Sequence, residues 1–142
     1  MKPMARDETS RRFTTSPTLA EIETLAEEAL ATIPEALRQH VRGVVIRVEE
    51  LPNEEIERLM GLESPFDLMG LYRGVPLHNR TVFDSGRLPN MIFLYRRSLL
   101  DYWCDSGEDL THLIRHVMIH EIGHHFGFSD ADMHRLEREA GN

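Results

Sequence analysis

Two histidines four residues apart, His120 and His124, are the residues of this chain best suited to hold a metal ion. Glu121 follows the first of them, so that the stretch reads H-E-x-x-H. On an α-helix, positions i and i+4 share one face, and both imidazoles can then reach the same ion. A carboxylate beside the first histidine faces the same opening without binding the ion, which suits a general base that accepts a proton from water. If the stretch is helical, its spacing predicts metal-assisted hydrolysis.

A third ligand is expected a few residues downstream. Gly127 can adopt the left-handed conformation that ends a helix, and Asp130 lies in the chain that returns after it. The full pattern is H-E-x-x-H-x-x-G-x-x-D. Two imidazoles and one carboxylate leave a coordination position open, as in catalytic zinc sites, whereas structural zinc is usually closed by four ligands dominated by Cys. The chain has a single cysteine, Cys104. We therefore predict one zinc ion, or a neighbouring first-row ion, on three side chains: His120, His124 and Asp130.

The other histidines near the motif are weaker candidates as ligands. His112 and His116 continue the run at spacing four, but each step of four drifts by about 40° around a helix, so no single ion can use all of them. We interpret His116 as a residue beside the site and His112 as partly exposed. His125 follows the second ligand by about 100° of helix rotation and points away from the metal. His134 is a rival for the third ligand, although we favour Asp130.

Four further polar residues could lie near the site, but we assign them roles in ion pairs, on the surface or in the core. Arg115 and Glu137 are interpreted as surface or ion-pair residues. Tyr72 and Tyr95 have hydroxyls that could stabilise an oxyanion, but core packing is the simpler role for both. None of the four is therefore predicted to take part in the reaction.

The motif has to lie on a helix, and the residues around it support one. Ser106, followed three residues later by Asp109, resembles a capping box with a shortened acidic partner. We predict a helix over about residues 108–126, with one face packed on a core. Apolar residues recur along it at helical spacing: Leu110, Leu113, Ile114, Val117, Met118, Ile122 and Phe126.

The rest of the chain predicts a single α+β domain over residues 18–142, with a small mixed sheet packed against helices, after a flexible tail at 1–17. Thr18 is a candidate N-cap, with Glu21 three residues on. Residues 61–89 are rich in Gly, Pro, Asn, Asp and Ser and predict a long loop or lid, with a possible short strand around 77–83. We expect helices over residues 18–33, 54–60 and 131–139, strands over 41–48 and 91–95, and a turn or helical turn at 98–101.

Composition narrows the classes of function. The 142 residues are 41% hydrophobic and 28% charged, which fits one globular domain. A net charge of -8 argues against binding nucleic acid or anionic lipid, because both depend on basic patches. We see neither a secretory signal nor a run of about 18 apolar residues that could span a membrane. We expect a cytoplasmic monomer that acts on a peptide or protein substrate, with no nucleic-acid or membrane partner.

The motif from His120 to Asp130 resembles the extended zinc motif of metzincin-type metallopeptidases, with aspartate in place of the third histidine. From about Leu19 to the last helix, the chain resembles the small bacterial zincin-like metallopeptidases. This resemblance implies a compact α+β zincin with zinc on the three predicted ligands and Glu121 as general base. Larger metzincins have a methionine turn beneath the metal, and Met133 is the sole methionine after the third ligand. Three segments carry the likeness: P-F-D-L-M-G-L-Y-R-G at 65–74, I-F-L-Y-R-R at 92–97 and R-H-V-M-I-H-E-I-G-H-H-F-G-F-S-D at 115–130.

The reaction that this resemblance implies is zinc-dependent hydrolysis of a peptide bond. An edge strand of the sheet, for which we favour residues 91–95, would pair with an extended substrate. One alternative is a zinc-dependent endoribonuclease of the kind that matures ribosomal RNA, with ligands at the same spacing. That class ends its motif in histidine, lacks the glutamate, and suits a basic rather than an acidic chain. The other alternative is a non-catalytic zinc-binding regulatory or interaction domain, and an open position beside Glu121 would favour an enzyme over it.

Overall fold

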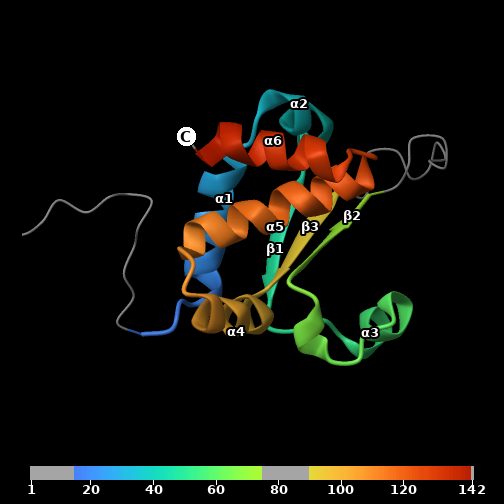
Figure 1. Cartoon of the computed structure of the whole chain (residues 1–142). Coiled ribbons are helices and arrows are strands. Elements are labelled where there is room, and N and C mark those ends of the chain that lie inside the picture. The colour runs from blue at the N-terminus through green and yellow to red at the C-terminus, as the bar shows by residue number, and fades with distance from the viewer. Residues whose placement is uncertain (1–14, 75–89, 142) are drawn as a thin grey trace, which may run out of the picture.

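A three-stranded mixed sheet carries two long helices, α1 and α5, over one face (Figure 1). The computed structural model describes residues 15–74 and 90–141. The strands are β1 (Val45–Glu49), β2 (Gly70–Arg73) and β3 (Met91–Tyr95), in the order β1-β3-β2. This α+β architecture confirms the expected fold class.

The central strand of the sheet is β3. It pairs in parallel with β1, where Ile46 lies opposite Ile92, and antiparallel with β2, where Tyr72 lies opposite the same residue. Our expectation that residues 91–95 form an edge strand is therefore wrong. Within the described part of the chain, the sheet edges are β1 and β2. A strand as apolar as β3 is better buried between two neighbours than left with unpaired backbone at an edge.

Helices make up most of the rest of the described chain. The acidic helix expected at 54–60 is confirmed at those residues, and the capping box of the first helix is confirmed by reciprocal hydrogen bonds between Thr18 and Glu21. None of the helices in the described ranges is long and apolar enough to cross a membrane. The helical elements in chain order are α1 (Leu19–Thr32), α2 (Glu35–Arg38), η1 (Gln39–Val41), α3 (Glu54–Met60), η2 (Pro65–Asp67), α4 (Arg96–Ser106), α5 (Leu110–His125) and α6 (Asp130–Gly141).

Several local expectations need correction. The turn or helical turn expected at 98–101 is helical and belongs to the longer helix α4, which follows β3 without a break. The irregular stretch expected from residue 61 contains η2 and β2. The short strand considered around 77–83 and most of the expected tail lie outside the described residues. At the start of α5, Asp109 rather than Ser106 is the N-cap, because its carboxylate accepts the backbone N–H of His112 at 3.0 Å.

The main core lies between the sheet and the pair formed by α1 and α5. Side chains from one face of the sheet, such as Ile92 and Leu94, are fully buried against these helices. Gly70 of β2 lets the strand approach α5 closely, since a Cβ there would lie 2.7 Å from a methyl group of Val117. Each fully buried leucine or isoleucine contributes about 1.5–3 kcal/mol. The core therefore fixes α5, and with it the motif, against β2.

Tyr95 should make the fold sensitive to alkaline pH. Its side chain is 2% exposed, and burial together with the negative charge of Glu49 raises its pKa to about 12. Because the folded chain binds this proton more tightly than the unfolded chain, where the pKa is about 10, stability is fully present below pH ~10 and falls as the pH rises toward ~12.

This expectation can be checked by measuring the free energy of unfolding in urea across that pH range. Tyr95→Phe should show a smaller alkaline loss than the wild type, while Tyr102→Phe, at an exposed position, should behave like the wild type. An alkaline loss of equal size in Tyr95→Phe would show that another group is responsible.

Candidate metal centre

The motif lies on the C-terminal half of α5, and α6 runs back antiparallel along the same helix (Figure 1). Gly127 has a φ of 80°, and its N–H donates to the carbonyl of His124 at 3.3 Å. The next N–H, of Phe128, donates to the carbonyl of Gly123 at 2.8 Å. These bonds close the end of α5 as glycine helix caps do. As a result, the first turn of α6 starts beside the last turn of α5.

The two helices of this hairpin are closest where Gly123 of α5 faces Met133 of α6. A Cβ at Gly123 would lie 2.8 Å from Met133 Cγ and still closer to its sulfur, and Met133 is fully buried. The one methionine after the motif therefore fills the space between the two helices. Because residue 123 has no side chain, α6 can pack close to α5, and polar groups on the two helices can then approach each other.

Gly123→Ala is expected to destabilise the protein. Overpacking a buried site costs about 1–3 kcal/mol, and the gain in helix propensity of about 1 kcal/mol offsets only part of it. The midpoint of thermal unfolding should therefore fall. Gly141→Ala, in α6 and with open space around its Cβ, is the control and should unfold at or slightly above the wild-type temperature. A Gly123→Ala protein as stable as the wild type would mean that the hairpin is loosely packed.

All three predicted ligands lie along the seam between α5 and α6. His124 Nε2 is 3.8 Å from Asp130 Oδ1, and these side chains are 59% and 84% exposed. The ring centroids of His120 and His124 are 5.9 Å apart. His120 is the more enclosed of the two histidines, with its side chain 19% exposed. The structure thus places His124 and Asp130 together at the open end of the seam, with His120 one turn further in.

His120 also lies close to an acidic residue outside the predicted set of ligands. Its Nε2 lies 3.3 Å from Glu137 Oε1, and the same carboxylate oxygen contacts Nδ1 of His116. One ligand atom from each of the three side chains lies within 4.8 Å of the other two. His120 Nε2 and Glu137 Oε1 are both buried, and they lie within ion-pair distance of each other. Buried polar atoms of this kind normally have a partner, and a metal ion can be one.

The ion-pair interpretation of Glu137 agrees with the structure, in which its partners are the two histidines of this cluster, His116 and His120. The sequence contains a signal for this, because Glu137 follows Asp130 by seven residues, or two helical turns. Both residues therefore lie on the same face of α6. Asp130 lies opposite His124, and the two helices run antiparallel. Two turns beyond Asp130 on α6 therefore lie opposite the residue about two turns before His124 on α5, which is His116.

Burial and nearby charge set the protonation of the motif residues. Burial lowers the pKa of His120, and the charge of His116 lowers it further, which favours the neutral imidazole that binds metals. Burial raises the pKa of Glu121, and this rise is opposed by the charge of His124. The motif therefore combines a histidine biased toward its ligand form with a carboxylate that holds a proton more readily than usual.

The remaining histidines of the region have separate surroundings. The ring of His125 packs against Tyr72 of β2, with centroids 4.4 Å apart, so it faces the sheet. The ring of His134 is 6.0 Å from that of His120, across the seam. His112 is exposed near the start of α5.

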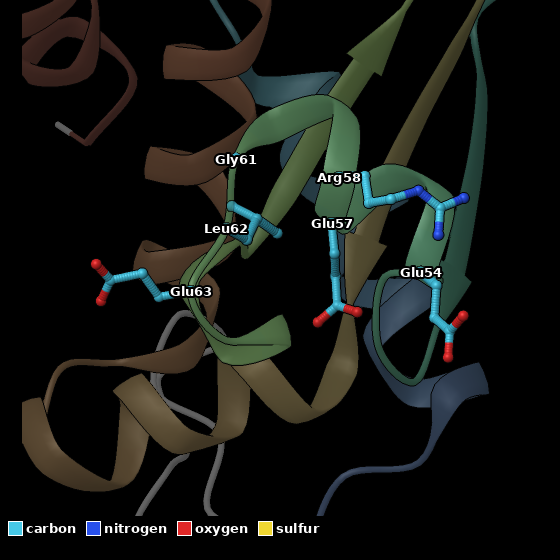
Figure 2. A pocket seen from close by; sticks show the side chains of 6 residues that line it. All are labelled: Glu54, Glu57, Arg58, Gly61, Leu62 and Glu63. Carbon is cyan, nitrogen blue, oxygen red and sulfur yellow. The ribbon is translucent and has the colours of Figure 1, made fainter.

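A surface pocket at α3 is a separate feature (Figure 2). Three glutamates contribute to it, but Figure 2 shows Glu63 projecting away from Glu54 and Glu57, so the carboxylates do not converge on one ligand. The residues that line this pocket belong to α3 and the turn after it, and include none of the motif: Glu54, Glu57, Arg58, Gly61, Leu62 and Glu63.

A helix that carries H-E-x-x-H, packed on a mixed sheet and followed by a sharp return of the chain, defines the zincin class. The family model described as zincin-like metallopeptidase matches residues 41–140, a span that includes the whole sheet and the α5–α6 hairpin. The chain belongs to this family. No curated protein matches the sequence. The family match confirms the resemblance drawn from the motif and its flanking segments.

Proposed function

We propose that the protein is a zinc-dependent metallopeptidase, with zinc held by His120, His124 and Asp130 and with Glu121 as general base. The observation that carries this proposal is the placement of H-E-x-x-H on one face of α5, with Asp130 facing it from the first turn of α6. Family membership supports the same class of activity.

The donor atoms around His120 fit a divalent metal. Imidazole nitrogens and carboxylate oxygens are the ligands of catalytic zinc, and His120 presents a buried Nε2 that lies 3.3 Å from a carboxylate oxygen of Glu137. A zinc ion bound here would polarise the carbonyl of the scissile peptide bond and lower the pKa of water toward about 7.

Glu121 then performs the proton transfers of the reaction. Its carboxylate accepts a proton from the attacking water and gives it to the amine that leaves. Burial raises the pKa of Glu121, so this carboxylate is a stronger base than an exposed glutamate. The half-buried position on α5 also holds the carboxylate beside the ligand histidines without placing it among them.

The substrate strand would add to β2 instead of β3. Within the described residues, β2 is an edge of the sheet, and it lies against α5 through Gly70 and Val117. Tyr72, in the same strand, packs on His125 at the end of the motif helix. An extended peptide that forms backbone hydrogen bonds with the outer edge of β2 would therefore run alongside the motif. This favours a peptide or protein in an extended conformation as the substrate.

The proposal is tested by incubating the purified chain with a peptide library and identifying cleavage products by mass spectrometry, with and without a zinc chelator. We expect new peptide termini that disappear with the chelator. A structured RNA in a parallel reaction tests the endoribonuclease alternative. Stoichiometric zinc with neither peptide nor RNA cleaved would contradict the proposal and favour the non-catalytic alternative.

A further inference from the structure

We propose that His116, His120 and Glu137 form a second position for a divalent first-row cation such as Zn²⁺, here called the inner position. It shares His120 with the position formed by the motif ligands, called the outer position. The inference goes beyond the proposed function, because it concerns metal binding alone and requires no peptide substrate.

The donor atoms of His120 and Glu137 have the spacing expected around a bound ion, whereas His116 Nδ1 and Glu137 Oε1 are closer together and would move apart on binding. In a tetrahedral zinc site with bonds of about 2.0–2.2 Å, donor atoms are about 3.3 Å apart. His120 Nε2 and Glu137 Oε1 are 3.3 Å apart, and all three ligand atoms lie within 4.8 Å of one another. The rings of His116 and His120 are tilted by 34°, with centroids 4.2 Å apart. Small side-chain adjustments would therefore let all three donors reach one ion.

Burial also favours the inner position. The side chains of His120 and Glu137 are each 19% exposed and that of His116 is 44% exposed, compared with 59% and 84% for His124 and Asp130. Two of the atoms that would bind the ion are buried, and Glu137 Oε1 already lies against both imidazoles. A cation at this point would bind both buried atoms, and one carboxylate would offset half of its charge.

The shared histidine makes the two positions compete. A neutral imidazole has one nitrogen with a free lone pair, so Nε2 of His120 can bind one ion at a time. An ion at the inner position removes His120 from His124 and Asp130, and the outer position is then incomplete. The hairpin would thus hold one ion that moves between a hydrolytic position and an inner position remote from the exposed ligands.

The test measures Zn²⁺ affinity of the whole chain by competition with a chromophoric chelator. In His124→Ala, which lacks an outer ligand, we expect Zn²⁺ binding to persist. Adding Glu137→Gln to this variant should weaken the remaining binding by about tenfold or more. Adding Glu139→Gln, an exposed glutamate on the same helix, should leave it unchanged.

Two further measurements make the result independent of any single variant. Asp130→Asn provides a second background without a complete outer position, at a side chain that is 84% exposed. Imidazole ¹⁵N NMR in either background should show Zn²⁺-dependent shifts for His116 and His120.

Loss of all Zn²⁺ binding in both backgrounds, or no effect of Glu137→Gln in either, would overturn the inner position. Absence of peptide cleavage by the wild type would overturn the proposed function alone, because none of these measurements depends on turnover.

Discussion

Glu121→Gln is expected to abolish peptide hydrolysis while zinc content stays at the wild-type level. The amide has nearly the shape of the carboxylate but cannot accept the proton of the attacking water. General acid–base catalysis typically contributes about 10²–10⁴-fold, so kcat should fall by that factor. The residue lies beside the ligand histidines on α5, and its replacement removes none of the three predicted donors to zinc.

The comparison needs kcat, KM and zinc content measured on the same preparations. Glu108→Gln, an exposed glutamate just before α5, is the matched control and should keep wild-type turnover. Removing the half-buried carboxylate, whose pKa burial raises, should leave the fold intact. Turnover of Glu121→Gln at the wild-type rate would show that another group is the base.

His120→Ala is expected to cost more zinc affinity than any other single substitution in the hairpin. His120 belongs to both candidate positions, whereas His124 and Asp130 serve only the outer one and Glu137 only the inner one. Removal of a ligand from a three-ligand site should weaken binding by about 100-fold or more, since loss of an outer-shell partner alone costs about 10–100-fold. His124→Ala should have a smaller effect.

We would rank the zinc affinities of these variants in two steps. Metal content is measured after purification without added metal, and competition with a chelator follows. His112→Ala is the control, because His112 is an exposed histidine on the same helix. Circular dichroism of each metal-free variant separates loss of a ligand from loss of fold. Stoichiometric zinc in His120→Ala would contradict both candidate positions at once.

Features of the fold that depend on neighbouring residues could be predicted from the sequence. The capping box at Thr18 and Glu21 and the helix from Glu54 to Met60 are set by short-range hydrogen bonds and apolar spacing. The helix that carries the motif was also predictable, within two residues at its start and one at its end. Its N-cap was misassigned because Ser106 and Asp109 are both good capping residues, and only the structure shows which one meets a free N–H.

Features that depend on distant parts of the chain could not be predicted. The apolar character of β3 favours a central position, but the two strands that pair with it, β1 and β2, come from distant parts of the chain. β2 is short and starts with a glycine that reads as a turn signal, but its close packing on Val117 requires that glycine. α4 was missed because it follows β3 directly, with no residue that marks a boundary.

The candidate site also contains residues that the local sequence predicts and one that only the packing of distant residues reveals. His120, Glu121, His124 and Asp130 belong to one continuous motif, so spacing alone identifies them. Glu137 becomes part of the site only through the packing of α6 on α5, at the contact between Gly123 and Met133.

The central claim is that hydrolysis depends on zinc held by this hairpin, and a zinc titration of the metal-free chain tests it most directly. Cleavage of a peptide identified from the library is followed as zinc is added. We expect no cleavage at the start, a rise with added zinc, and a plateau near one equivalent per chain. Cleavage that proceeds in excess chelator, or a metal-loaded chain that cleaves no peptide, would contradict it.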